Sequence, residues 1–358
     1  MSAFQAPVRF FLGSNTPAGF VGTTETLYTP DGWRVYLLKS GAGTGKSTLL
    51  RRVYDQLTAA GETAEVFCCS SDPHSLDAVR FPDRRLCLID GTAPHNVEPL
   101  YWGAVEQVVP LSLCMGSLYD NASAVIALTD KKRALHRHCC EHLRAASSLL
   151  QDARRIENDC LDREKVCRFA RRLAISEWQS GGTQTEPLAS ETRFLSAFTP
   201  EGWITLYDTM QALCPRIYSI EDEQGVAASL LLSELEKAAV ADGIRCIACP
   251  SPLFPNDGPE HLLLPHIGVA FTSSNRFHKV DFPIFRRIHV SRFLDAERLR
   301  RHRLRLSFLY RTAAEMLHEA TALSEQAKTA HDQLERYSTD AMDWQRYEEL
   351  TEEVLRNI

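Results

Sequence analysis

Short apolar runs and long amphipathic stretches alternate along this chain. Runs of the kind that form buried parallel strands occupy residues 35–38, 64–69 and 86–89. Apolar residues at helical spacing extend over two long stretches, from about 124 to 178 and from about 293 to 358. The pattern predicts a three-layer α/β core with a mainly parallel sheet, followed by a long helical segment.

The second half of the chain repeats the first, which predicts a duplicated fold. At a displacement of 182 residues, Arg34-Val35-Tyr36 is echoed by Arg216-Ile217-Tyr218, Gly43 by Gly225 and Leu49-Leu50 by Leu231-Leu232. In the helical stretches, the run from Glu141 to Ala146 lines up with the run from Glu315 to Ala320, a displacement of 174 residues. Each unit is therefore expected to comprise an α/β core and its own helical extension.

Length and the repeat together predict two domains. The chain has 358 residues, against a typical domain of roughly 150. We expect a first domain over residues 1–180, a linker that begins Gly181-Gly182-Thr183 over 181–188, and a second domain over 189–358.

Composition narrows the function classes. A net charge of −6 makes nucleic acid an unlikely partner, because such binding needs a basic surface. No apolar run approaches the length of a membrane span, and the first residues lack the pattern of a signal peptide, so no membrane partner is expected. The eleven cysteines form neither a disulfide framework nor a zinc pattern, which favours reduced thiols in a cytoplasmic protein.

The most informative motif is Ser40-Gly41-Ala42-Gly43-Thr44-Gly45-Lys46-Ser47-Thr48, between an apolar run and a helical pattern. This is the context of a phosphate-binding P-loop (Walker A motif), in which glycines let backbone N–H groups converge on phosphate oxygens. The backbone of Gly41, Ala42, Gly43, Thr44, Gly45, Lys46, Ser47 and Thr48 would cradle the phosphates of a nucleoside triphosphate. Ser40 departs from the strict motif, which has glycine at that position.

Within the motif, Lys46 is predicted to contact the β- and γ-phosphates and Ser47 to ligate Mg²⁺. Asp90 ends the apolar run Leu86-Cys87-Leu88-Ile89, which places a carboxylate at the carboxyl end of a buried strand as a second Mg²⁺ ligand. The alternative is an Asp that opens a turn before Gly91. Gly91 stands where many ATPases carry a water-activating Glu. Hydrolysis would therefore be slow, or the base would come from elsewhere in the chain, or the phosphoryl acceptor would be a molecule other than water.

Polar residues after the run 64–69 are weaker candidates. Asp72 and His74 could face the γ-phosphate or an acceptor, because ligands bind at the carboxyl ends of strands in such sheets. The alternative is a turn built on Ser71, Asp72 and Pro73. His95 has a counterpart in His278, so a structural role is favoured for it over a γ-phosphate contact.

The second copy lacks this chemistry. At the same displacement Lys46 corresponds to Ala228, and Asp90 corresponds to Thr272 or Ser273. The three carboxylates of Glu221-Asp222-Glu223 stand where a triphosphate would bind. Loss of the lysine together with the aspartate predicts one live site and one degenerate half.

The assembled motifs resemble a family of bacterial, largely uncharacterised ATP-binding proteins built as tandem P-loop NTPase-like halves. The resemblance covers nearly the whole chain and is carried by Asn15-Thr16-Pro17-Ala18-Gly19-Phe20, the P-loop, Cys69-Ser70-Ser71-Asp72, Asp90-Gly91-Thr92-Ala93-Pro94-His95, His331-Asp332-Gln333-Leu334-Glu335 and Ala341-Met342-Asp343-Trp344. It implies nucleotide binding and leaves the reaction open. Both halves of that family usually carry a P-loop, so the present chain departs from it in the second half.

The sequence thus predicts a Mg²⁺-dependent ATP-binding protein whose leading function is ATP hydrolysis coupled to a conformational change between the halves. A small-molecule or nucleotide kinase is the first alternative, with its acceptor near Asp72 and His74. A non-catalytic ATP sensor that presents its helices to a protein partner is the second. ATP is favoured over GTP because Thr129-Asp130-Lys131-Lys132 is not a guanine-recognition motif.

Overall fold

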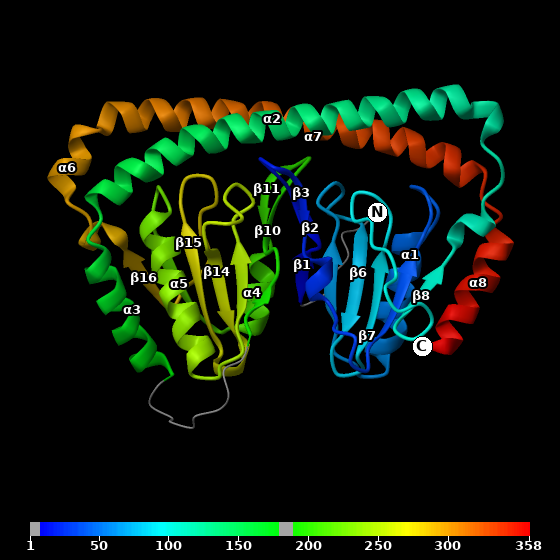
Figure 1. The fold of residues 1–358 in the computed structure, drawn as a ribbon, viewed down its shortest axis with the longest axis horizontal. Helices are drawn as coiled ribbons and strands as arrows, with labels where there is room; N and C mark the ends of the chain where they lie inside the picture. Colours follow the sequence, from blue (N-terminus) through cyan, green and yellow to red (C-terminus); the bar gives the residue numbers. More distant parts are fainter. Residues whose placement is uncertain (1–7, 179–188) are drawn as a thin grey trace.

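The computed structural model describes residues 8–178 and 189–358, so the predicted linker 181–188 lies outside the described residues. Two α/β cores stand side by side beneath a pair of long helices that span both of them (Figure 1). The predicted α/β class with mainly parallel sheets is confirmed by two six-stranded mixed sheets.

The first sheet has the strand order β1 (Arg9–Phe11), β5 (Glu65–Cys68), β6 (Leu76–Phe81), β7 (Leu86–Asp90), β4 (Arg34–Leu38) and β8 (Glu106–Val109). Its strands run parallel except β6, which is antiparallel to both neighbours. Because β6 returns antiparallel from β5, short turns connect β5 to β6 and β6 to β7, and no helix is needed there.

The second sheet repeats this order with β9 (Glu191–Thr192), β13 (Ile247–Pro250), β14 (Pro259–Leu264), β15 (Val269–Ser274), β12 (Arg216–Glu221) and β16 (Arg286–His289). One helix follows the central strand in each core: α1 (Lys46–Ala59) after β4 and α5 (Val226–Ala241) after β12. Both helices bury leucines at positions displaced by 182 residues, such as Leu49 and Leu231. The displacement found in the sequence therefore holds through strand and helix.

Two hairpins meet at the centre of the molecule (Figure 1). They are formed by β2 (Gly13–Thr16) with β3 (Gly19–Gly22) and by β10 (Ser196–Thr199) with β11 (Gly202–Thr205). The Ser14 hydroxyl accepts a hydrogen bond of 2.9 Å from the backbone N–H of Phe198, and Phe11 bridges to Phe194. The cores are thus joined by backbone contacts as well as by packing.

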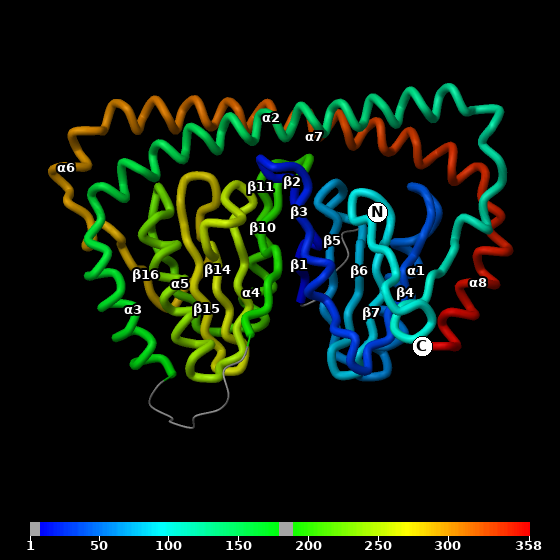
Figure 2. The backbone as a smooth tube through the Cα atoms, viewed as in Figure 1, coloured from blue at the N-terminus to red at the C-terminus, as the bar shows by residue number. Residues whose placement is uncertain are grey.

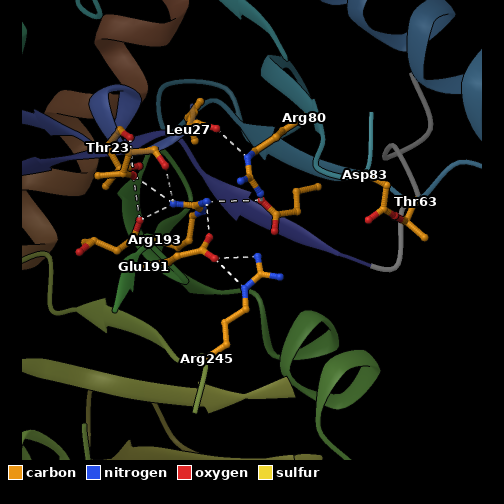
Figure 3. A network of polar contacts seen from close by, with 11 residues as sticks. Thr23, Leu27, Thr63, Arg80, Asp83, Glu191, Arg193 and Arg245 are labelled. Atoms are coloured by element: carbon orange, nitrogen blue, oxygen red, sulfur yellow. Dashed lines mark hydrogen bonds and ion pairs between the residues drawn. The ribbon is translucent and has the colours of Figure 1, made fainter. Parts of the chain in front are cut away.

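A buried ion network lies at the same junction (Figure 3). Arg193 is fully buried, and its guanidinium lies 2.8 Å from the Glu191 carboxylate and 3.5 Å from that of Glu65 in the other core. Arg80 pairs with Glu65 at 2.9 Å, and Arg245 pairs with Glu191 at 2.6 Å. Because a buried charge without partners is costly, the network fixes how the two cores face each other.

The two long helices carry the helical extension of each half to the core of the other half. Helix α2 (Ala122–Cys160) leaves the first core and crosses above the second, where α3 (Arg163–Glu177) packs against α5 (Figures 1 and 2). Helix α7 (Arg303–Asp340) runs antiparallel to α2 toward the first core, where α8 (Trp344–Asn357) buries Tyr347 and Val354. The helical extension of each half therefore packs on the core of the other.

The helical register differs from the expected one. The N-cap residues of the last helix in each half, Asp162 and Asp343, occupy equivalent places 181 residues apart, and α2 and α7 begin at the same displacement. The pairing of Glu141 with Glu315, at 174 residues, is therefore wrong by seven. Seven residues are two helical turns, so a shift of that size leaves the buried positions of an amphipathic helix in step and escapes detection in the sequence.

The remaining helices are short: α4 (Tyr207–Leu213), α6 (Ala296–Arg301) and the 3₁₀ turns Thr24–Thr26, Leu111–Cys114, Tyr119–Asn121, Pro265–Ile267 and Val290–Phe293. Within the described ranges, none of the helices is long and apolar enough to cross a membrane. All eleven cysteines are free thiols, and most of them are buried.

Candidate functional site

The predicted P-loop connects β4 to α1 and needs glycine at two positions. Gly43 and Gly45 have φ of 72° and 87°, in the left-handed region that side chains rarely adopt. A Cβ atom on Gly43 would lie 2.5 Å from the backbone oxygen of Glu335, and one on Gly45 would lie 2.6 Å from the Tyr347 ring. Both backbone shape and close packing therefore exclude larger residues.

The structure brings together Lys46, Ser47 and Asp90. Strands β4 and β7 are parallel neighbours, with Leu38 opposite Asp90, so the P-loop and the aspartate emerge at one edge of the sheet. The Lys46 ammonium donates to the carbonyl oxygens of Ser40, at 3.1 Å, and of Gly41, and it lies 3.6 Å from Asp90 Oδ2. The predicted convergence of lysine and carboxylate is confirmed as geometry.

The oxygen atoms at this edge suit a small hard cation. Ser47 contributes a hydroxyl at the start of α1, where it accepts a hydrogen bond of 2.9 Å from Leu76 N–H. Asp90 Oδ1 accepts hydrogen bonds from the N–H and hydroxyl of Thr92, so the carboxylate is held in one orientation. Among residues 8–178 and 189–358, no group of three or more His, Cys, Asp or Glu side chains is arranged to hold a metal. One carboxylate and one hydroxyl fit Mg²⁺, which completes its shell with water and phosphate oxygens.

Side chains from the helical extension of the second half bind the backbone of the predicted P-loop. The Thr339 hydroxyl on α7 donates a 3.0 Å hydrogen bond to the Gly43 carbonyl, and the Tyr347 hydroxyl on α8 donates one of 2.9 Å to the Gly45 carbonyl. On α7, a hydrogen bond from His331, together with Lys328 and Lys46, lowers the pKa of Glu335 despite its burial. These contacts could not be predicted from local patterns, because roughly three hundred residues separate the partners and no local pattern encodes the docking.

Asp72 lies in a turn after β5, as the alternative interpretation predicted. Its Oδ1 accepts a 3.3 Å hydrogen bond from His74 N–H, and its Oδ2 lies 3.7 Å from the Lys328 ammonium on α7. The His74 ring lies 3.4 Å from Glu201 and is half exposed. These contacts give Asp72 a role in docking α7, and its catalytic role stays a prediction.

His95 belongs to a pair that occurs in both halves. Its Nε2 lies 3.0 Å from Asp77 Oδ2, and His278 Nε2 lies 3.0 Å from Glu260 Oε1 at the equivalent place in the second core. Burial disfavours the cation, but Asp77 raises the pKa of His95 above its ordinary value. Because the pair persists in the half that lacks the lysine, it serves the fold, in line with the structural role favoured from the sequence.

In the second half, carboxylates of the protein itself occupy the start of the helix. Asp222 Oδ2 accepts a 2.8 Å hydrogen bond from Ala228 N–H, and Glu157 Oε2 on α2 accepts one of 3.0 Å from Val226 N–H. At the structural displacements of 182 and 181 residues, Ser40 and Ser338 replace these two acids in the first half. The start of the helix is therefore occupied by these carboxylates in the second half, whereas serines stand at the two equivalent positions in the first half.

Burial makes this arrangement depend on pH. Glu157 is fully buried, and burial together with the neighbouring Asp222 raises the pKa of Glu157 to about 9. Glu157 therefore remains protonated at neutral pH, which removes one of the two charges that would otherwise repel each other.

A large cavity opens beside the predicted P-loop of the first half. Its volume is about 830 Å³, and its wall includes Gly41 and Ala42. The equivalent space in the second half measures about 50 Å³, and Tyr310 and Phe277 line it. Five basic side chains of α2 line the large cavity: Lys132, Arg133, His136, Arg137 and Arg144. Lys132 and His136 are four residues apart, as are Arg133 and Arg137, and Arg144 follows Arg137 by seven residues, a helical spacing that could have indicated this wall.

Comparisons with protein-family models, curated proteins and solved structures found no match to this chain. The case for a function therefore depends on the geometry of the site.

Proposed function

We propose that this protein is a P-loop NTPase with two NTPase-like halves, of which only the first binds Mg·ATP, and that it hydrolyses ATP. The observation that carries the proposal is the 3.6 Å approach of Lys46 Nζ to Asp90 Oδ2 beside a glycine loop and Ser47. A cation for the β- and γ-phosphates, backbone N–H groups, and two oxygen ligands for Mg²⁺ thus meet at one edge of the sheet.

Each part of the site has a separate role. The backbone from Gly41 to Thr48 binds phosphate oxygens, and Lys46 stabilises negative charge on the β- and γ-phosphates. Ser47 and Asp90 would hold Mg²⁺, which supplies charge neutralisation at the same oxygens. The Glu335 carboxylate on α7 is a candidate for the base that Gly91 does not provide. It lies close enough to Lys46 for the lysine charge to contribute to its lowered pKa.

The exchanged helices support coupling between the halves. Thr339 and Tyr347 bind the carbonyl groups of Gly43 and Gly45, within the segment that would close around phosphates. A change in this loop therefore acts directly on α7 and α8, and α7 packs along the length of α2. Nucleotide binding would in this way alter the position of helices that span both cores.

A phosphotransferase is the second candidate, and the cavity bordered by Gly41 and Ala42 favours it. An acceptor in that cavity would lie against the P-loop rather than near His74. The test follows purified protein with Mg·ATP for phosphate release and, in parallel, for transfer of labelled phosphoryl groups to a panel of nucleosides and metabolites. Phosphate release that requires Lys46 supports the ATPase, and transfer to an added acceptor supports the kinase. Tight ATP binding with neither signal would replace both with the sensor, and absence of ATP binding would overturn the proposal.

A further inference from the structure

The cavity beside the P-loop has the size and position of a second ligand site. It lies between the hairpin residue Phe20, the P-loop, helix α2 and the end of α7 at Leu334. A volume of about 830 Å³ falls within the range of small-molecule pockets in proteins. The wall comes from both halves of the chain, because α2 and α7 meet there.

The charge of the wall selects an anion. Four lysine and arginine side chains line the cavity, Lys132, Arg133, Arg137 and Arg144, whereas Glu141 is the one acid in its lining. Lys132 Nζ lies 3.0 Å from His331 Nδ1, and the other nitrogen of that ring lies 3.5 Å from Glu335. Burial, together with the positive charge of Lys132 and His331, lowers the pKa of His136 to about 4. The lining thus carries more basic than acidic side chains, which favours an anion inside the cavity.

Most of the remaining wall is apolar, although Asn15, Ser71, Thr129 and Ser338 also line it. Phe20, Met115, Leu118 and Val125 line it together with Pro94. A wall with cations on one helix and apolar side chains opposite fits a molecule that carries an acidic group on an apolar body. Inorganic ions would leave most of this surface without a partner.

The second half provides an internal control for the assignment. At the helical displacement of 181 residues, Lys132, Arg133 and His136 are replaced by Ala313, Ala314 and Leu317. Thr129 is replaced by Tyr310, a side chain that lines the small cavity of about 50 Å³. The half that lacks the P-loop lysine therefore also lacks both the space and the cations. Loss of the two features together indicates that cavity and P-loop serve one function.

We propose that this cavity binds a small organic anion, with a phosphate or carboxylate group on an apolar body, as a second ligand next to the nucleotide. The inference rests on the proposed function in one respect, namely that ATP binds at the P-loop and does not itself fill the cavity. Lys132 and Arg133 contact the acidic group, and Phe20 packs against the body of the ligand.

The first arm of the test uses the dye anilinonaphthalene sulfonate, an aromatic body with one anionic group, titrated into folded full-length protein. Thr129→Tyr copies the closed half and should weaken dye binding by roughly tenfold. Lys132→Ala and the exposed Arg133→Ala should each also weaken dye binding by roughly tenfold, the loss expected for one charge-assisted contact. Lys131→Ala removes a neighbouring exposed lysine outside the cavity and should leave binding unchanged. Equal dye affinity in the wild type and all three cavity variants would overturn the site.

The second arm identifies the class of ligand by displacement of the dye. Organic phosphates and carboxylates should compete, and uncharged analogues of the same molecules should compete far less. Equal competition by the uncharged analogues would overturn the anionic assignment.

The third arm separates the cavity from the nucleotide site by equilibrium dialysis of Mg·ATP. Thr129→Tyr should keep ATP affinity, and Lys46→Ala should lose ATP while it keeps the dye. Parallel loss of ATP and dye in Thr129→Tyr would assign the cavity to the nucleoside and overturn the inference. Unchanged ATP affinity in Lys46→Ala would instead contradict the proposed function, and the dye result would still report on the cavity.

Discussion

The hydroxyl of Tyr347 donates a 2.9 Å hydrogen bond to the carbonyl oxygen of Gly45, which joins the last helix of the chain to the loop before α1. The Tyr347 ring also occupies the space that a side chain at position 45 would need. One contact therefore docks α8 and sets the shape of the P-loop. Formation of the site depends on the arrival of the C-terminal helix from the other half of the chain.

Tyr347→Phe should lower the free energy of unfolding by about 1 kcal/mol, the net worth of one hydrogen bond, and speed amide exchange in the P-loop. Urea unfolding and hydrogen exchange measured on the same samples check this. Tyr119→Phe is the matched control, because the Tyr119 side chain is exposed. Unaltered exchange in the P-loop of Tyr347→Phe would show that α8 does not hold the loop.

Lys46→Ala should reduce ATP affinity by at least roughly tenfold, since the ammonium is the cation at the β- and γ-phosphates. Equilibrium dialysis with labelled ATP measures the change, and Lys131→Ala serves as the control for loss of one positive charge. Circular dichroism should show the same fold in both variants, because the Lys46 contacts are with loop carbonyls and Asp90. An unchanged affinity would remove the P-loop assignment.

Asp90→Asn should leave a folded protein whose phosphate release falls by more than roughly a hundredfold and needs more Mg²⁺, because an amide oxygen is a weaker ligand than a carboxylate. A Mg²⁺ titration of activity at saturating ATP makes the measurement. Glu98→Gln is a control, since Glu98 pairs with Lys39 on the same face of the core but at an exposed position. An identical Mg²⁺ dependence in Asp90→Asn would favour the turn role for Asp90.

Arg193→Leu should destabilise the protein by about 3–5 kcal/mol, because it leaves the carboxylates of Glu65 and Glu191 with fewer partners at a buried junction. Denaturant unfolding of the full chain measures the loss. Arg168→Leu removes an exposed ion pair on α3 and should cost less than about 1 kcal/mol. Similar stability for the two variants would show that the junction does not depend on the network.

The raised pKa of Glu157 predicts that the protein loses stability at alkaline pH. Its pKa is raised from 4.5 to about 9 by folding, so the folded chain retains a proton that the unfolded chain releases between these values. Its contribution is complete below pH 4.5 and declines as the pH rises toward 9. Urea midpoints at pH 5.5 and 8.5 should therefore differ more in the wild type than in Glu157→Gln. Glu164→Gln, at an exposed position on α3, should behave as the wild type does.

Local sequence signals predicted the first core well. Glycines at positions 43 and 45 indicated a tight loop between strand and helix, and the apolar run that ends at Asp90 predicted a buried strand with a carboxylate at its end near that loop. These signals succeed because strand, turn and helix start lie within a few residues of one another. The antiparallel strand β6 was missed, because Asp77 and Arg80 interrupt its apolar residues although the whole strand is buried.

Contacts between distant segments could not be predicted in the same way. The correspondence between α2 and α7 in the repeat was misaligned, because a shift of seven residues preserves the apolar stripe. The approach of Tyr347 to the P-loop and the basic wall at Lys132 both depend on how the two long helices pack and cross. No local pattern reports which core a long helix will cover.

The sequence by itself determined the glycine-rich loop with Lys46, the strand that carries Asp90, the repeat, and the loss of the lysine in the second half, because backbone preferences and hydrophobic period act over short distances. Only the tertiary structure decided that each helical extension packs on the opposite core, that Glu157 and Asp222 fill the second helix start, and that a basic cavity opens beside the first. Those outcomes follow from which distant surfaces bury each other, a balance of packing and desolvation that is settled when the whole chain is folded.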